Sequence, residues 1–200
     1  MLNVEQLTTD HIGPVDLSIE DGQCFAVMGA SGTGKSLMLR ALVDLDVNHG
    51  DISLDSHKRS EMGADEWRRL VSLVPAESGW WTDLVGDHFL RRQTAAELVK
   101  EVGLPDCLDW EVSRLSTGER HRLAIVRALE LSPRVLLLDE PTAALDDDAT
   151  AVVEELLAKQ LSSGVSIILV THDPHQATRM GDRSFLIKEG KLQEIIEGLS

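Results

Sequence analysis

The sequence predicts an α/β fold with a mainly parallel core sheet and flanking helices. Two apolar runs, residues 135–138 and 165–170, are separated by a helical pattern over residues 150–161. Buried apolar strands on either side of a helix are typical of a βαβ unit in a parallel sheet. A third apolar run, residues 24–28, precedes a glycine-rich turn and a helical run over residues 37–42. This run adds a second strand–helix unit.

Chain length and composition predict one folded domain. A chain of 200 residues can bury one large core, and we assign residues 1–200 to a single domain. Hydrophobic residues make up 42% and charged residues 26% of the chain, which is ordinary for a globular protein. Cys24 lies in an apolar run and Cys107 close to Pro105, so we expect two reduced thiols rather than a disulfide.

The first part of the chain predicts strands with one intervening helix. Residues 4–18 form short strands joined by a turn at Gly13-Pro14, which gives an N-terminal antiparallel β portion. Residues 51–55 alternate as a strand does, and residues 71–74 form another strand that ends at a proline. The polar stretch over residues 61–70 between these two strands predicts a helix.

The middle of the chain predicts a short helical insert. From residue 86 the apolar residues recur at helical spacing, with Ala95, Leu98 and Val99 on one face. A second helical run follows over residues 120–131. We therefore place a helical insert at approximately residues 86–132 within the α/β domain.

The glycine-rich turn between strand and helix has the composition of a phosphate-binding loop. It consists of Gly29, Ala30, Ser31, Gly32, Thr33, Gly34, Lys35 and Ser36. Small residues let backbone N–H groups close on a phosphate, and the helix N-terminus adds partial positive charge. Lys35 can reach the β- and γ-phosphate oxygens, and the Ser36 hydroxyl can bind magnesium. The turn therefore predicts that the protein binds ATP or GTP.

Two carboxylates follow the apolar strand at residues 135–138. Asp139 and Glu140 would lie at the C-terminal end of this strand, where open parallel sheets bind their ligands. We expect Asp139 to hold a magnesium ion and Glu140 to orient or deprotonate the water that attacks the γ-phosphate. A plain acidic cap on the next helix is the alternative interpretation of this pair.

Two further segments carry candidate phosphate ligands. Ser116 and the Gly118 amide precede a helical run and would lie at a helix N-terminus suited to an anion, although alone they would be only a helix cap. His172 follows the strand at residues 165–170 and could hydrogen-bond a γ-phosphate. Taken alone, a histidine at a strand end is more often structural.

Together and in this order, these segments resemble the ATP-binding cassette (ABC) family of ATPases. Residues 29–36 resemble its Walker A loop, and residues 135–140 resemble its Walker B strand with the catalytic glutamate. Residues 115–119 resemble the family signature, usually written LSGGQ. Residues 144–146 resemble the D-loop, and His172 resembles the switch histidine. The signature separates this family from kinases and small GTPases, which share only the phosphate loop.

The resemblance implies a P-loop NTPase of ABC type that hydrolyses ATP with Mg²⁺. Lys35, Glu140 and His172 would be its catalytic residues. Two such ATPase subunits form a head-to-tail dimer, in which the signature of one subunit completes the ATP site of the other. Ser116 and Gly118 would then contact the partner's ATP, and the D-loop would bring Asp146 to the same site. The sequence leaves open whether the dimer is a homodimer or a heterodimer.

Three features depart from the family pattern. The family carries a glutamine after the strand at residues 71–74, whereas Glu77 in this segment is only a weak candidate for a metal ligand. The chain has no tyrosine to stack on adenine, and His11 is the nearest candidate. Thr117 and Glu119 replace a glycine and the glutamine of the signature, while its serine and the following glycine are retained.

The resemblance further implies that the chain powers transport of an unidentified substrate through separate transmembrane permease subunits. In transport members, the region beyond Glu77 forms a groove that receives a helix of the membrane subunit. Trp80 and Trp81 are adjacent, so we expect at least one of them at an interface, and packing of both beneath the helical insert is the alternative. The alternative function is a soluble ABC ATPase in iron–sulfur assembly or another non-transport role. A third is a non-hydrolysing regulatory module.

Charge and hydropathy limit the partners and the location. The chain has 19 basic and 34 acidic residues and a net charge of -15, which disfavours binding to nucleic acid. No apolar run approaches the about 20 residues that span a bilayer, and residues 1–6 lack the features of a secretory signal. We therefore expect a cytoplasmic protein that is peripheral on the inner face of the cell membrane.

Overall fold

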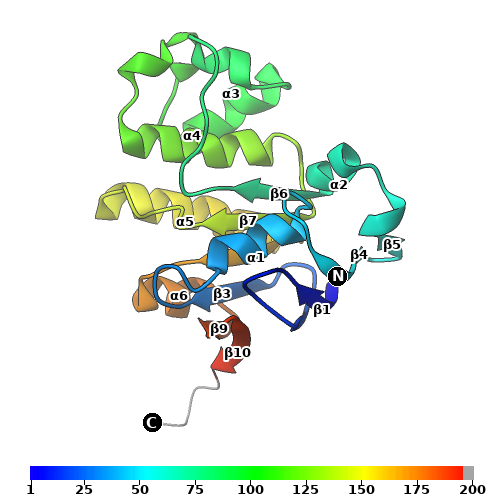
Figure 1. The fold of residues 1–200 in the computed structure, drawn as a ribbon. Helices are drawn as coiled ribbons and strands as arrows, with labels where there is room; N and C mark the ends of the chain where they lie inside the picture. Colours follow the sequence, from blue (N-terminus) through cyan, green and yellow to red (C-terminus); the bar gives the residue numbers. More distant parts are fainter. Residues whose placement is uncertain (196–200) are drawn as a thin grey trace.

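The computed structural model describes residues 1–195 and is built around a six-stranded sheet (Figure 1). The strand order is β10-β9-β3-β8-β7-β6. The strands are β3 (Cys24–Met28), β6 (Val71–Val74), β7 (Val135–Asp139), β8 (Ser166–Val170), β9 (Arg183–Lys188) and β10 (Lys191–Ile195). All neighbouring strands are parallel except β9 and β10, which form an antiparallel hairpin. The predicted α/β fold with a mainly parallel core sheet is confirmed.

A second, antiparallel sheet is built from the first strands of the chain. Its order is β2-β1-β4-β5. The strands are β1 (Leu2–Thr8), β2 (Val15–Ile19), β4 (His49–Leu54) and β5 (His57–Lys58). The buried residues of β1 alternate with polar ones and pack against α1 and the core sheet. This sheet confirms the predicted N-terminal antiparallel β portion.

The helices cover both faces of the core sheet. They are α1 (Lys35–Leu42), α2 (Ala64–Leu70), α3 (Arg92–Glu101), α4 (Thr117–Leu129), α5 (Asp147–Ser162) and α6 (Pro174–Met180). Figure 1 shows α3 and α4 together in the upper part of the molecule, beyond β6 and α5. The boundaries that we predicted for the helical insert, residues 86–132, enclose α3 and α4. None of the helices in the described part of the chain is both long and apolar enough to cross a membrane.

The core sheet is buried on both faces by two separate hydrophobic clusters. Val135 and Leu137 of β7 pack in the cluster that contains α1 and the antiparallel sheet. Leu136 and Leu138 of the same strand pack in the other cluster, with residues of α4 and α5. Alternate side chains of a strand point to opposite faces, so a strand covered on both faces is apolar throughout. This explains the continuous apolar run that identifies β7 in the sequence.

Two helices begin earlier than their apolar patterns indicate. The helix predicted from residue 120 begins at Thr117, because the Ser116 side chain caps it by accepting from the Glu119 N–H. The helix predicted from residue 150 begins at Asp147, because the Asp146 carboxylate accepts from the Ala149 N–H. In both cases the polar first turn is helical because a capping side chain satisfies its free N–H groups.

The chain beyond α6 adds two strands that we did not predict. β9 extends the parallel sheet beside β3, and β10 pairs back on β9 through a turn at Glu189 and Gly190. β10 has no buried residue, so its sequence shows no apolar alternation. The predicted helix over residues 61–70 is also shorter than expected, because residues 59–61 form a separate 3₁₀ turn before α2.

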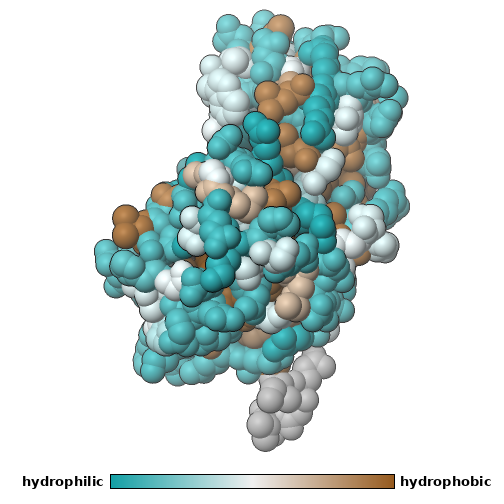
Figure 2. Space-filling model, turned by 90° about the vertical axis from the view of Figure 1, so that its right-hand side faces the viewer, coloured by the Kyte–Doolittle hydropathy of each residue, from teal (hydrophilic) through white to brown (hydrophobic). Residues whose placement is uncertain are grey.

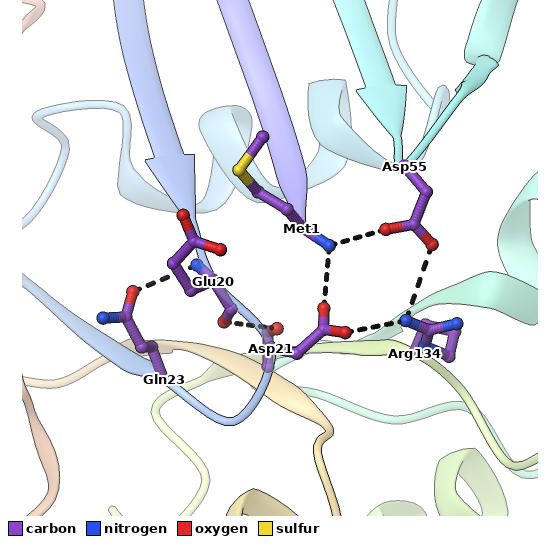
Figure 3. A network of polar contacts seen from close by, with 7 residues as sticks. Met1, Glu20, Asp21, Gln23, Asp55 and Arg134 are labelled. Atoms are coloured by element: carbon purple, nitrogen blue, oxygen red, sulfur yellow. Dashed lines mark hydrogen bonds and ion pairs between the residues drawn. The ribbon is translucent and has the colours of Figure 1, made fainter.

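An ion-pair network joins the two sheets at one end (Figure 3). The Met1 amino group lies 2.7 Å from both Asp21 Oδ1 and Asp55 Oδ1. The guanidinium of Arg134, just before β7, lies 3.0 Å from Asp21 and 3.5 Å from Asp55. The hydrogen bond from the Met1 amino group lowers the pKa of Asp21. These side chains are about half exposed, so the network contributes little to the stability of the fold.

The two cysteines are free and buried, as we expected. Burial raises the pKa of the Cys24 thiol to about 12 and that of the Cys107 thiol to about 11. Both thiols therefore remain protonated and unreactive near neutral pH.

Candidate active site

The phosphate loop lies between the end of β3 and the start of α1, as predicted. Gly29 and Gly34 have φ values of 152° and 102°, which favour glycine. A Cβ on Gly29 would lie 2.7 Å from the Ile187 carbonyl oxygen, and a Cβ on Gly34 would overlap the Ile12 side chain. The loop therefore keeps its curvature because Ile187 of β9 and Ile12 of the loop after β1 leave room only for glycine at these two positions.

The Lys35 side chain lies inside this curved loop. Its Nζ atom donates to the Gly29 carbonyl oxygen at 2.8 Å and to the Ala30 carbonyl oxygen at 2.9 Å. The residue is only 5% exposed. Lys35 is the first residue of α1, so its charge adds to the positive end of the helix dipole. This arrangement provides a compact site for an anion.

Glu140 and His172 stand side by side at the ends of neighbouring strands. His172 Nε2 lies 2.9 Å from Glu140 Oε1. The Glu140 N–H donates to the Val170 carbonyl oxygen at 3.0 Å, and its φ is 51°. A left-handed backbone costs a non-glycine residue about 1–2 kcal/mol, so its surroundings must hold Glu140 in this conformation.

One cavity of about 170 Å³ brings the phosphate loop together with this pair. It is lined by Ser31, Gly32, Gly34, Lys35, Ser36, Leu37, Glu140 and His172. Two segments that are far apart in the sequence therefore meet at the carboxyl edge of the parallel sheet, where such folds bind their ligands. A cationic amine, free hydroxyl, carboxylate and imidazole around one small cavity suit a bound phosphate chain.

Asp139 fits the role of a metal ligand. It is the last residue of β7 and is only 7% exposed. Within residues 1–195 its carboxylate takes part in no hydrogen bond or ion pair. A buried carboxylate without such a partner is costly unless a cation compensates it. Together with the exposed Ser36 hydroxyl, it offers the oxygen ligands that Mg²⁺ prefers.

The signature residues lie at the start of α4, outside this cavity. The Ser116 hydroxyl accepts from the Glu119 N–H at 3.2 Å, and Glu119 Oε2 accepts from the Ser116 N–H at 2.7 Å. This reciprocal capping box holds the first turn of α4. A Cβ on Gly118 would lie 3.1 Å from the Leu145 side chain, so the segment before α5 packs closely against the signature.

The remaining predicted site residues also lie outside the phosphate-loop cavity in the described part of the chain. Asp146 caps α5, and Glu77 is exposed in the loop after β6. His11 is exposed and lines a separate cavity of about 550 Å³. This second cavity adjoins the phosphate loop and is also lined by Gly32, Thr33, Leu37, Glu189 and Gly190.

The sequence analysis missed Glu189 and Gly190, which form the turn between β9 and β10. Both residues have a positive φ, as in a two-residue hairpin turn, although Glu-Gly is a weaker hairpin signal than Asn-Gly or Asp-Gly. That signal was available in the sequence, although the exposed strand β10 made it weak.

Comparison with known proteins identifies the family. Residues 12–143, more than half of the chain, match the family model described as ABC transporter.

The chain belongs to the ABC transporter family.

Several ABC transporter ATP-binding proteins match most of the chain. It is 33% identical over 190 residues to the aliphatic sulfonates import ATP-binding protein SsuB 2 of Agrobacterium fabrum, covering 92% of this chain and 73% of that protein. It is 33% identical over 205 residues to the phosphate import ATP-binding protein PstB 2 of Natronomonas pharaonis, with 90% and 72% covered.

Solved structures of ABC cassettes have the same fold. The ATP-binding subunit of an ABC transporter aligns with a TM-score of 0.89 at 23% identity, covering 98% of this chain and 90% of that chain. A dimeric bacterial ABC transporter cassette aligns with a TM-score of 0.79 at 26% identity, covering 98% of each chain. This ABC protein is therefore an ATPase that powers transport through separate membrane subunits.

Proposed function

We propose that this ABC ATPase hydrolyses ATP at the cavity shared by the phosphate loop, Glu140 and His172, and that it drives an importer. The observation that carries this proposal is the 2.9 Å contact between His172 Nε2 and Glu140 Oε1 beside the phosphate loop. In this arrangement a carboxylate and an imidazole face the site of the terminal phosphate. The relatives named above are import ATP-binding proteins, which supports the direction of transport.

Each residue of the cavity has a distinct role in this proposal. Lys35 and the backbone N–H groups of the phosphate loop bind the β- and γ-phosphates. This loop runs from Gly29 to Ser36 and includes Ala30, Ser31, Gly32, Thr33 and Gly34. Ser36 and Asp139 hold Mg²⁺, which neutralises phosphate charge when it is bound. Glu77 remains a weak candidate for a further metal ligand, because its exposed carboxylate would have to move towards the cavity.

Glu140 acts as the base in this proposal. Its carboxylate orients the attacking water and accepts its proton. His172 donates a hydrogen bond to the γ-phosphate and holds Glu140 in place. The left-handed backbone of Glu140 is consistent with a side chain that is fixed before substrate arrives.

The signature residues serve a second ATPase subunit. Ser116 and Gly118 do not line the cavity of their own chain within residues 1–195. Ser116 caps the exposed N-terminus of α4 and Gly118 lies in its first turn, which suits a phosphate from another subunit. We therefore propose a head-to-tail dimer in which Ser116 and Gly118 contact the partner's ATP, with Asp146 fixing the adjacent D-loop. The solved bacterial cassette named above is dimeric, which supports this arrangement.

The membrane subunit docks in a groove between α1, β6 and α4. The groove is lined by Val43, Leu45, Arg68, Ser72, Leu73, Val74, Pro75, Ser78, Ala124, Arg127, Ala128 and Leu131. Figure 2 shows apolar residues gathered where the upper part of the molecule meets the lower part. Trp81, which is 69% exposed, lies beside the groove because its ring is 5.0 Å from the Arg127 guanidinium. An apolar groove with an exposed indole fits a helix of a permease subunit.

This docking places the chain at the inner face of the cell membrane. The relatives are import proteins for different substrates, including sulfonates, phosphate and methionine, so the transported substrate stays unassigned.

The variant Glu140→Gln tests the hydrolytic proposal. It keeps the shape of the side chain but removes the base, so we expect ATP turnover to fall by roughly 100- to 10,000-fold while ATP binding is retained. The variant should also accumulate as an ATP-bound dimer in size-exclusion chromatography. Glu66→Gln, an exposed glutamate on α2, is the matched control and should keep wild-type turnover. Unchanged turnover in Glu140→Gln would remove Glu140 from the mechanism.

Capture of the tagged chain from detergent-solubilised native membranes tests the partner. A polytopic membrane protein in stoichiometric amount would support the transporter assignment and identify the substrate class. Recovery of soluble partners alone would contradict docking to a permease.

A further inference from the structure

His88 is buried beneath the loop that carries the two adjacent tryptophans. It lies in a 3₁₀ turn over Val85–His88 and is only 4% exposed. Its ring centroid is 4.7 Å from that of Trp80 and 4.6 Å from that of Trp81, both in edge-on geometry. With Arg127 these residues form what we call the tryptophan cluster.

Hydrogen bonds fix the protonation state of His88 in this fold. The backbone N–H groups of Trp81 and Thr82 lie 2.9 Å and 3.2 Å from His88 Nε2. An N–H group can only donate, so Nε2 must accept and carry no proton. The Leu84 carbonyl oxygen, which can only accept, lies 3.0 Å from Nδ1. Both constraints require the neutral imidazole with its proton on Nδ1.

Arg127 connects this loop to the signature helix α4. Its guanidinium carbon lies 5.0 Å from each indole ring, and it donates to the Gly79 carbonyl oxygen at 3.0 Å. Burial lowers the pKa of Arg127. The tryptophan cluster therefore already holds one poorly solvated positive charge. A second positive charge on His88 would lie in the same cluster and would be unfavourable.

The charged groups around His88 do not compensate such a charge. Asp83 precedes the turn and Asp87 lies within it, and both are exposed, while Asp109 is paired with Arg92. Within residues 1–195 no carboxylate forms an ion pair with the His88 ring. Protonation at Nε2 would therefore replace an acceptor with a donor that faces two other N–H donors.

We propose that neutral His88 is a positioning residue that holds Trp81 at the edge of the docking groove, and that loss of its Nε2 acceptor releases Trp81 and weakens docking. The effect on docking rests on the groove being the permease site, as proposed above. The effect on Trp81 itself is a property of the free chain. The two parts can therefore fail separately.

Fluorine NMR of the free chain labelled with fluorotryptophan tests this role. His88→Leu removes the acceptor for the Trp81 and Thr82 N–H groups, so we expect the Trp80 and Trp81 signals to move and those of Trp67 and Trp110 to stay. His88→Gln should keep the wild-type positions, because glutamine can still accept from these N–H groups. His57→Leu, at an exposed histidine on β5, should leave the tryptophan signals in place. Unmoved Trp80 and Trp81 signals in His88→Leu, or an equal movement in His88→Gln, would overturn the proposal.

Nitrogen NMR of the histidine rings in the wild type tests the position of the His88 proton without any substitution. Near neutral pH, the His88 signals should report a proton on Nδ1 and none on Nε2. A proton on Nε2 would contradict the arrangement of donors around this ring and would also overturn the proposal.

Membrane capture of the same variants tests the consequence for docking. We expect His88→Leu to retain roughly tenfold less permease than the wild type, which corresponds to the loss of one docking contact. His88→Gln should retain the wild-type amount. If the tryptophan signals move in His88→Leu but capture does not fall, the groove is not the permease site. If neither changes, the role of His88 fails.

Discussion

The phosphate-loop cavity and the docking groove are both formed where distant segments meet, but they are held in different ways. At the cavity, Lys35 bonds to backbone oxygens of its own loop, only a few residues away. At the groove, Arg127 of α4 reaches back to the Gly79 carbonyl oxygen and covers the rings of Trp80 and Trp81. The phosphate loop is thus organised by local backbone geometry, and the groove by long-range side-chain contacts.

The arginines show the same difference. Arg40, Arg179 and Arg183 in the α/β part each form an ion pair with a carboxylate. Arg68 and Arg127 line the groove and bond to backbone carbonyl oxygens, and neither forms an ion pair within residues 1–195. Two uncompensated guanidinium groups in a chain of net charge -15 favour an occupant that carries a carboxylate. The groove therefore carries two guanidinium groups without a carboxylate partner in the described part of the chain, whereas Arg40, Arg179 and Arg183 are each paired.

Removal of the local anchor should have the largest effect. In Lys35→Ala the loop loses the amine that bonds to two of its carbonyl oxygens and that would bind phosphate. We expect the Kd for ATP to rise by more than roughly 100-fold, or about 3 kcal/mol, in calorimetric titrations. Lys58→Ala on the exposed strand β5 is the control and should bind ATP normally. A change below tenfold would mean that backbone N–H groups alone hold the phosphates.

The backbone strain of the phosphate loop can be separated from its steric requirement. Gly34→Ala forces a side chain into a φ of 102° and against Ile12, and we expect a loss of about 2–3 kcal/mol in urea unfolding. Gly164 has a similar φ of 96° but no heavy atom within 4 Å of its Cβ position. Gly164→Ala should therefore cost only the strain, about 1 kcal/mol. Equal losses would show that the contact with Ile12 relaxes.

The sequence predicts the phosphate loop well because the loop is held by its own backbone. A glycine-rich turn between an apolar strand and a helix has few conformations, so the residues from Gly29 to Ser36 indicate their own geometry. Asp139 and Glu140 follow from the end of one apolar strand. The contact between Glu140 and His172 was not predicted, because it depends on β7 and β8 being neighbours in the sheet.

The less predictable parts depend on contacts that leave no periodic signal. β10 is exposed throughout, so its residues show no apolar alternation to mark a strand. The role of His88 arises from N–H groups and rings that the loop brings around it, and a single histidine in the sequence indicates none of this. The apolar pattern of the sequence also fails to predict the first turns of α4 and α5, because these turns are polar and depend on capping side chains.

Loss of the long-range anchor should have a smaller effect on stability than loss of a required glycine. Arg127→Met keeps the length of the side chain but removes the contacts with both indole rings and the bond to Gly79. We expect a loss of about 1–2 kcal/mol in urea unfolding. Arg114→Met is the matched control, because Arg114 is exposed and covers the single ring of Trp110 at 5.1 Å. A control loss as large as that of Arg127→Met would contradict a special role for the tryptophan cluster.

The smallest effect concerns the charge in the signature, where Glu119 stands in place of glutamine. Hydrogen bonds from the Ser116 N–H, and to a smaller extent from the Ser116 hydroxyl, lower the pKa of Glu119 below its ordinary value of 4.5. A carboxylate with a lowered pKa stabilises the folded state above its ordinary pKa, and this contribution is lost as the pH falls through the folded value. Glutamine can form the same capping box without titrating.

Urea unfolding of wild type and Glu119→Gln at about pH 6 and about pH 3 measures this contribution. The wild type should lose more stability on acidification than the variant does, by less than about 1 kcal/mol, because the cap is partly exposed to water. Glu97→Gln on α3, an exposed glutamate outside any cap, should behave as the wild type. An identical pH dependence in wild type and Glu119→Gln would mean that Ser116 does not hold the carboxylate in solution. The signature would then be free to present Ser116 to a phosphate without first breaking the capping box.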